Sequence, residues 1–312
     1  PPLPTPAGPV PAGSPPAGLP DPRSMFMGFV YSFTALPPAM RPRAADDRVG
    51  HFTTRYLDFS DDVTPSSSRH IVNRWRLEKK DPAAALSEPK EPIVYWIDRN
   101  VPERYRASVR EGILEWNKAF EKIGFKNAVV ARQQTKDDDF DTLDARHASI
   151  RWFTGSDVGF AIGPSRVDPR SGEILDADIG MSDGFARGSR RIMVDEVGQP
   201  LVDGHRHHDG EFCSYGEELA HELEFAQGVL EARGLAPDGP EAEALAQARV
   251  KGTIVHEVGH TLGLRHNFRA STAYTLAQLD DVEFTRANGL SASVMDYIPF
   301  NIALKGEKQG EF

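Results

Sequence analysis

Apolar residues recur at helical spacing in one long stretch of the chain. Between Arg104 and Ile123 they step by three or four positions along one face: Tyr105, Val109, Ile113, Trp116, Phe120 and Ile123. This spacing predicts an amphipathic helix that ends at Gly124. A second helix is predicted from Glu241 to Leu262, with Pro240 at a favourable first position. A third helix is predicted just before it, at Glu217–Gly234.

Short runs of β-branched and aromatic residues predict strands at Ile93–Asp98, Ala148–Phe153 and Glu173–Met181. In the last of these, apolar residues alternate with Asp176, Asp178 and Gly180, which is typical of a strand with one solvated face. The alternation favours placing both aspartates on that solvated face. The other interpretation is that they contribute to a calcium site.

The part of the chain before Pro92 has a different character. Its first residues are mostly proline, glycine and alanine, which is typical of a linker, and residues 51–77 alternate around a turn-rich centre, which predicts a β-hairpin. We therefore expect a Pro-rich linker (residues 1–45), a hairpin-like segment that ends a preceding domain (46–91) and one larger domain (92–312). Strands first and helices later, with a strand–helix–strand start, predict an α+β or three-layer fold for the larger domain.

The charge and the single cysteine narrow the possible functions. The chain has 36 basic and 46 acidic residues, and a net charge of −10 argues against a nucleic-acid or anionic-membrane surface. No apolar run reaches the length of a membrane-spanning helix. Cys213 has no second cysteine to form an internal disulfide. Since the chain begins with Pro1 and stops after GEKQGEF, we expect it to be part of a longer polypeptide truncated at its C-terminus.

The segment TIVHEVGHTLGLRHN holds the densest group of candidate chemistry in the chain. On a helix, His256 and His260 lie four residues apart and share a face, so both can bind one zinc ion. Glu257 then lies beside the metal, where it can act as general base on a zinc-bound water. Gly263 allows the chain to reverse direction, and His266 can return as the third ligand. Three imidazoles leave a fourth position open, as in a catalytic zinc site.

The sequence HEVGHTLGLRH matches the signature HExxHxxGxxH, and the chain resembles the metzincin zinc proteases. The resemblance implies a methionine turn under the metal, which the segment SVMDY would provide through Met295. It also implies that Tyr297 approaches the zinc or the transition-state oxyanion, although an aromatic side chain that only packs near the floor of the site is an equal alternative. Asn267 after the third histidine does not match the astacins, matrixins or serralysins.

A wider resemblance covers residues 92–312, which are similar to one group of large bacterial zinc-dependent metalloproteases. The segments that carry it are LSEPKEPIVYWIDRNVPERYR, EGILEWNKAFEKIGF, GPSRVDPRSGEILDADI and SVMDYIPFNIALKGEKQGEF. The resemblance implies a mixed twisted sheet with an antiparallel edge strand, along which a protein or peptide substrate binds as an added strand. We expect Glu173–Met181 to be that edge strand. Enzymes of this kind generally work outside the cytoplasm, which implies an extracytoplasmic location.

The remaining histidines offer weaker candidates for a site. Residues 205–213 include three histidines and Cys213, and form either a histidine-rich loop, which the irregular spacing favours, or a second metal site. His221 has Phe225 where a second ligand would stand, so we exclude it. His51, His70 and His147 have no partners in sequence and are expected to be ordinary surface or strand residues.

Taken together, these features predict a zinc-dependent endopeptidase with one catalytic Zn²⁺. Two alternatives remain: a non-catalytic zinc-containing module that binds peptides or cell wall, and a zinc hydrolase that acts on non-peptide substrates. An intact Glu257 argues against the non-catalytic module. Substrate preference is not readable from the loop between His266 and Met295, which has no charge pattern that fixes a side-chain class.

Overall fold

A computed structural model describes residues 28–154, 161–183, 225, 228–229, 232–234 and 239–302 of the chain. The chain divides into two compact units, residues 1–32 and 33–312. In the first unit, the described residues 28–32 are exposed and form no helix or strand. The predicted Pro-rich start, the 205–213 loop and His221 lie outside the described residues, as does most of the predicted helix Glu217–Gly234.

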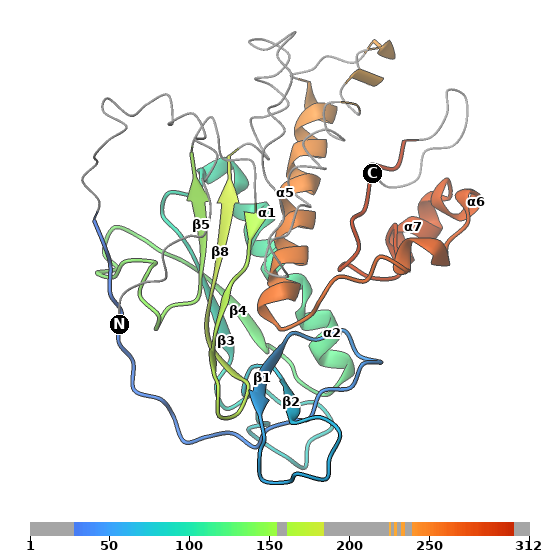
Figure 1. Cartoon of the computed structure of the whole chain (residues 1–312). Helices are drawn as coiled ribbons and strands as arrows, with labels where there is room; N and C mark the ends of the chain where they lie inside the picture. The colour runs from blue at the N-terminus through green and yellow to red at the C-terminus, as the bar shows by residue number, and fades with distance from the viewer. Residues whose placement is uncertain are drawn as a thin grey trace, which may run out of the picture. The chain divides into compact units, whose positions relative to one another are not determined.

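A mixed β-sheet forms the centre of the second unit (Figure 1). Its strands are β3 (Ile93–Ile97), β4 (Val129–Gln133), β5 (Ser149–Phe153), β6 (Ala161–Ile162), β7 (Ser165–Asp168) and β8 (Glu173–Ser182). The order is β4-β3-β5-β8-β6, and β7 also pairs with β8. The first four strands in this order are parallel, whereas β6 and β7 run antiparallel to β8. The fold is therefore a mixed sheet with an antiparallel edge, combined with a few helices.

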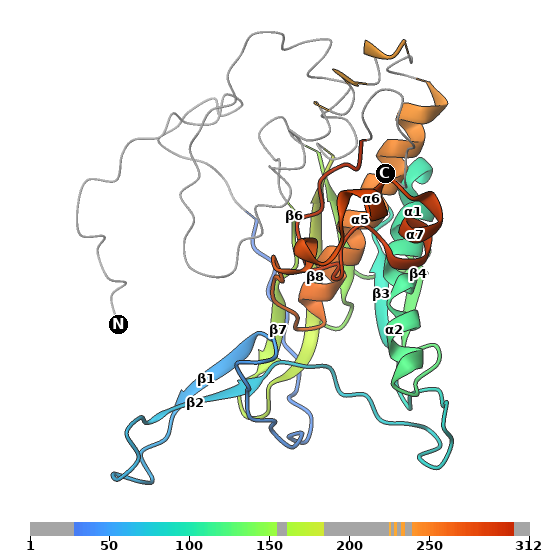
Figure 2. The same ribbon diagram turned by 90° about the vertical axis from the view of Figure 1, so that its right-hand side faces the viewer.

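Helices cover one face of this sheet (Figures 1 and 2). Helix α1 (Glu103–Glu115) lies over β3 and β4, and α5 (Pro240–Thr261) lies beside α1 and over β6 and β8. Helix α5 begins with Pro240 at its first position, as predicted. Between α5 and residue 302, the structure has three short helices: η1 (Ala270–Ala273), α6 (Leu276–Leu279) and α7 (Val282–Asn288).

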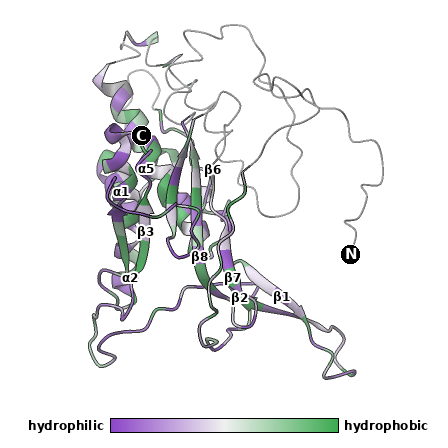
Figure 3. Ribbon diagram, turned by 90° about the vertical axis from the view of Figure 1, so that its left-hand side faces the viewer, coloured by the Kyte–Doolittle hydropathy of each residue, from purple (hydrophilic) through white to green (hydrophobic). Residues whose placement is uncertain are grey.

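The hydrophobic core fills the space between the sheet and these two helices. It contains apolar side chains from alternate positions of the strands and from the facing sides of the helices: Tyr95, Ile97, Ile150, Ile179, Met181, Val109, Ile113, Val250, Ile254 and Val258. Figure 3 shows the same pattern as hydrophobic colour on the strands and on the helix faces that meet them. The core therefore fixes α5 against the sheet, and α5 carries two of the three candidate metal ligands, His256 and His260.

The single helix predicted over Arg104–Ile123 is divided at Trp116. Helix α1 ends at Glu115, and a short helix α2 (Asn117–Lys122) follows. The Trp116 indole donates to the carbonyl of Val255 on α5 at 3.0 Å, and Asn117 exchanges two hydrogen bonds with Val129 on β4. These tertiary contacts redirect the chain, and Ile123 is left 66% exposed instead of continuing the apolar face.

Strand β8 is not the edge strand that the sequence predicted. It pairs with β5 on one side and with β6 and β7 on the other. Its polar residues are also not solvated, since Asp176 and Asp178 are almost fully buried. Arg166 of β7 contacts both carboxylates, at 2.6 and 2.9 Å, and Ser149 of β5 donates to Asp178 at 2.7 Å. The polar residues of β8 therefore contact polar side chains on the adjacent strands and do not face water.

The predicted hairpin is present and forms a separate two-stranded sheet, β1 (Thr53–Leu57) with β2 (Ser68–Val72). It lies at the end of the main sheet where β8 begins (Figures 1 and 2). The backbone of Arg74, just after β2, hydrogen bonds with Gly172 and Ile174 at 2.8 and 2.9 Å. The hairpin is thus joined to the sheet by main-chain contacts.

Among the residues that the structure describes, no helix is both long enough and apolar enough to cross a membrane.

Candidate metal centre

The end of α5 places two of the predicted ligands. His256 and His260 lie one turn apart on a face that is buried against the rest of the unit. The helix ends at Thr261, and Gly263 adopts φ +101°, a backbone conformation that residues with a side chain rarely adopt. The amides of Gly263 and Leu264 donate to the carbonyls of His260 and Gly259. This turn reverses the chain as predicted and leads directly into His266.

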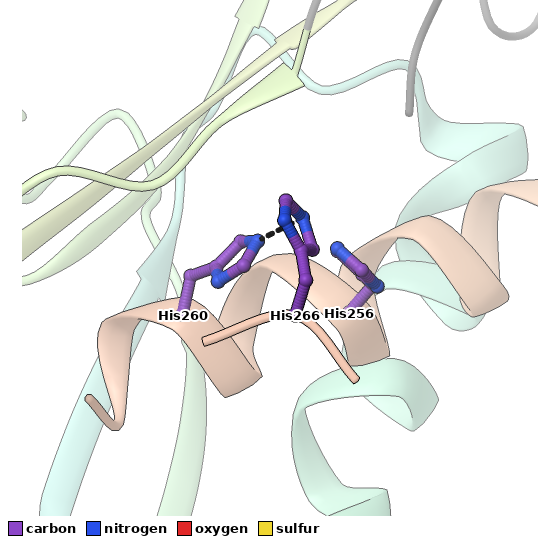
Figure 4. A group of neighbouring side chains, drawn as sticks. All are labelled: His256, His260 and His266. Atoms are coloured by element: carbon purple, nitrogen blue, oxygen red, sulfur yellow. Dashed lines mark hydrogen bonds between the residues drawn. The ribbon is translucent and has the colours of Figure 1, made fainter. Parts of the chain in front are cut away.

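The three histidines converge on one point (Figure 4). One ring nitrogen from each of His256, His260 and His266 lies within 4.8 Å of the others, and the Nε2 atoms of His260 and His266 are 3.1 Å apart. Two of these side chains are buried and the third is partly buried. The three imidazoles are therefore positioned to bind one metal ion, and nitrogen donors of this kind suit zinc.

Backbone carbonyls orient two of the rings. Nδ1 of His256 lies 2.8 Å from the carbonyl oxygen of Val294, and Nδ1 of His260 lies 2.8 Å from that of Leu264. A carbonyl only accepts, so each Nδ1 carries the proton and each Nε2 keeps its lone pair. Such outer contacts fix the tautomer and the ring direction at metal sites. The donor set therefore fits a zinc ion.

Burial also keeps these rings neutral. It lowers the pKa of His256 to about 3 and that of His266 to about 4, and it lowers the pKa of His260 as well. A neutral imidazole is the form that binds a metal. Consequently, protons compete with a metal for the nitrogens of His256 and His266 only well below neutral pH.

Glu257 is fully buried on the same helix, next to the first histidine. Gly163, directly after edge strand β6, passes so close that a Cβ atom there would lie 3.4 Å from Oε2 of Glu257 and 3.2 Å from its carbonyl oxygen. The antiparallel strand beside the site is therefore β6, and its neighbour Gly163 gives the Glu257 carboxylate room.

Residues 291–297 form a loop beneath the histidines. Met295 is buried, and its sulfur packs so closely on Gly259 that any side chain at Gly259 would overlap it. The main chain of Met295 accepts a hydrogen bond from Asn267 at 2.9 Å. The buried Asp296 accepts from the Ser271 and Tyr297 amides and from the Ser291 hydroxyl. Sequence reasoning missed Asp296, whose position directly after Met295 was the only signal.

Aromatic rings surround the cluster. The ring centroid of Tyr297 lies 4.8 Å from that of His266 and 5.7 Å from that of His256. Phe268 stacks on His266 with centroids 4.9 Å apart and remains 55% exposed, and Phe52 lies 5.7 Å from His260. The sequence did not predict that either phenylalanine contacts the histidines, because the sequence around an isolated apolar residue does not show which residues it packs against.

The other histidines differ in their surroundings. His51 is partly buried and pairs through its backbone with Leu264 of the third-ligand loop. His70 is exposed on the hairpin and contacts Thr53 at 3.2 Å, and His147 stacks on Phe140. Of the described histidines outside the triad, His51 alone is joined to that loop by a backbone bridge.

Comparison with known proteins agrees with a metal-binding protease region. A family described as Met-zincin matches residues 238–312, which hold the three histidines and Met295. A family described as a domain of unknown function (DUF5117) matches residues 16–80, which hold the hairpin. No curated protein and no solved structure matches the chain. The Met-zincin match and the histidine cluster together indicate a zinc metallopeptidase-like region.

The lowered histidine pKa values predict how the metal-free protein responds to acid. The pKa of His256 falls from 6.5 in the unfolded chain to about 3 in the folded one, so the unfolded chain binds more protons below pH 6.5. Above pH 6.5, His256 should therefore not lower the free energy of unfolding. Below pH 6.5, this residue should lower it by up to about 1.4 kcal/mol for each pH unit. Urea unfolding of zinc-free protein between pH 7.5 and 4.5 would measure it.

The matched control is His256→Gln, which removes this titration. Burial raises the pKa of Asp176 to about 6, which makes an opposite contribution, but Asp176 is present in both proteins and cancels in the difference. Wild type should therefore lose stability more steeply than the variant. Parallel curves would show that His256 is not held neutral.

Proposed function

We propose that this chain contains the catalytic centre of a zinc-dependent endopeptidase. The observation that carries the proposal is the convergence of His256, His260 and His266, with two Nδ1 protons held by backbone carbonyls, next to the buried Glu257. When bound by these three nitrogens, a zinc ion supplies Lewis acidity and an open coordination position.

Glu257 is the proposed general base. As a water molecule attacks the scissile carbonyl carbon, the new C–O bond forms and one water proton passes to the Glu257 carboxylate. The C–N bond then breaks, and Glu257 returns that proton to the leaving amine. The carboxylate is thereby restored. Its position beside His256 and its full burial support this role, since a buried carboxylate acts without competition from bulk water.

Tyr297 and Met295 are proposed to complete the centre. Tyr297 lies against His266, from where its hydroxyl would donate a hydrogen bond to the oxyanion of the transition state. Met295 would provide the apolar floor, because its sulfur packs on Gly259 between the two helical ligands. Neither residue is proposed as a metal ligand.

The proposed substrate is a protein or peptide bound as an extended strand. Among the described strands, β6 pairs with β8, and the substrate strand is proposed to pair with the other edge of β6. Residue 163, directly after β6, lies beside Glu257, so a substrate strand on this edge would pass close to the carboxylate. This edge replaces the one that the sequence assigned to Glu173–Met181. An extracytoplasmic location is a further proposal from the family resemblance, and fractionation of the producing cells would test it.

Purified protein should contain one zinc ion per chain and release new amino termini from casein. Treatment with 1,10-phenanthroline should abolish cleavage, and added Zn²⁺ should restore it. Metal content by mass spectrometry and amine release by fluorescamine would measure both results. Stoichiometric zinc without cleavage of casein or of a peptide library would instead favour a non-catalytic binding module.

A further inference from the structure

The loop that leads to the third histidine pairs with a segment more than two hundred positions earlier in the chain. The amide of Phe52 donates to the carbonyl of Gly263 at 2.7 Å, and the amide of Arg265 donates to the carbonyl of Gly50 at 2.9 Å. Between them, His51 and Leu264 form an antiparallel bridge. Residues 50–52 therefore hold the loop from both ends, and His266 follows one residue later.

The end of the hairpin adds a second layer of contacts behind this pairing. Asn73 donates to the carbonyl of Phe52 at 2.9 Å, and its own carbonyl lies so close to Gly263 that a Cβ atom would not fit. The Trp75 indole donates to the carbonyl of Thr261, the last residue of α5, at 2.8 Å. These contacts fix both the end of the helix and the turn that follows it.

One contact reaches a ligand directly. The Phe52 ring packs on the imidazole of His260, with centroids 5.7 Å apart and the planes tilted by 51°. In addition, the Nδ1 of His260 lies 2.8 Å from the carbonyl oxygen of Leu264, and Leu264 is paired with His51. The segment therefore restrains the His260 ring by packing and by the hydrogen bond that orients it.

We propose that residues 50–52 and 73–75, within the region matched by the family of unknown function, are positioning residues of the metal centre in the Met-zincin region. They hold His260 and the loop before His266 in the geometry that binds zinc before the ion arrives. The proposal rests on the proposed zinc site but not on cleavage. Residues 50–52 and 73–75 would thus be a structural support for the metal site.

Zinc affinity of the whole chain, measured by competition with a chromophoric chelator, tests the proposal. Removing an outer contact at a metal site typically weakens metal binding by about 10- to 100-fold. Phe52→Ala should show a loss of this size with the circular dichroism of the wild type, whereas Phe52→Tyr, which keeps the ring, should restore most of the affinity. Tyr56→Ala is the matched control, because Tyr56 is an exposed residue of the same hairpin.

Two further measurements keep the test independent of activity and of the folding of one variant. Trp75→Phe keeps an aromatic ring but removes the donor to Thr261, and it should weaken zinc binding and alter the visible spectrum of the Co²⁺-substituted protein. In zinc-free wild type, amide exchange over residues 262–266 should be slow, and it should accelerate in Trp75→Phe.

The outcomes separate this proposal from the proposed function. Wild type that binds zinc without cleaving casein would contradict the endopeptidase and leave the affinity comparison intact. Zinc affinity within twofold of wild type in both Phe52→Ala and Trp75→Phe would overturn the positioning role. A wild-type chain that binds no zinc would overturn both proposals.

Discussion

Glu257→Gln should lower kcat/KM for casein-derived peptides by about 10²- to 10⁴-fold, the range for removal of a general base. The substitution keeps the size of the side chain and removes only its ability to accept a proton. Glu257 is not one of the three clustered donors, so zinc content should stay at one ion per chain. Peptide cleavage and metal analysis on the same preparation would measure both.

Glu243→Gln is the control for this result. Glu243 lies on the same helix, near its start, where it pairs with Arg104 at the surface. The control should cleave at the wild-type rate. If Glu257→Gln retained wild-type activity, the proposed mechanism would be wrong. If it lost its zinc, the effect would concern metal binding instead of proton transfer.

Tyr297→Phe in the same assay separates the two interpretations of this residue. A donor to the oxyanion acts only in the transition state, so its loss should lower kcat by about 10²-fold with little change in KM. A tyrosine that only packs against His266 should tolerate phenylalanine, because the ring is retained.

Much of the candidate site follows from local sequence rules. The helix from Pro240 to Thr261 begins with proline and is followed by a glycine, which adopts positive φ, so its bounds were predicted within one residue. Spacing by four residues on such a helix brings His256 and His260 together without any tertiary information. The reversal at Gly263 brings His266 to them, also by a local rule.

Features that depend on long-range neighbours were not predictable in this way. Strands β4, β6 and β7 were missed, and the two at the antiparallel edge are only two and four residues long, too short for a periodic signal. Asp176 and Asp178 appeared solvated because one sequence does not show that Arg166 and Ser149 lie on adjacent strands. Likewise, nothing at Phe52 indicates that its ring meets His260.

Gly263→Ala should destabilise the protein by about 2–4 kcal/mol, because two penalties fall on one residue. The backbone at Gly263 has φ +101°, which strains any residue with a side chain. In addition, the new methyl group would lie less than 3.0 Å from the backbone carbonyl oxygen of Asn73, whose amide donates to the carbonyl of Phe52. Urea unfolding of zinc-free protein would measure the loss, and the same displacement should weaken zinc binding through His266.

Two other glycines separate these penalties. Gly289 has φ +73° and ψ −173°, but a Cβ atom added there would have its nearest neighbour 3.8 Å away, so Gly289→Ala should cost only the backbone strain, about 1–3 kcal/mol. Gly252 lies within α5 with open space around it, so Gly252→Ala should stabilise by about 0.5–1 kcal/mol. If Gly263→Ala cost no more than Gly289→Ala, the contact with Asn73 would not constrain the loop. A larger cost, accompanied by weaker zinc binding only at Gly263, would show that the hairpin segment and the third ligand share one close-packed turn.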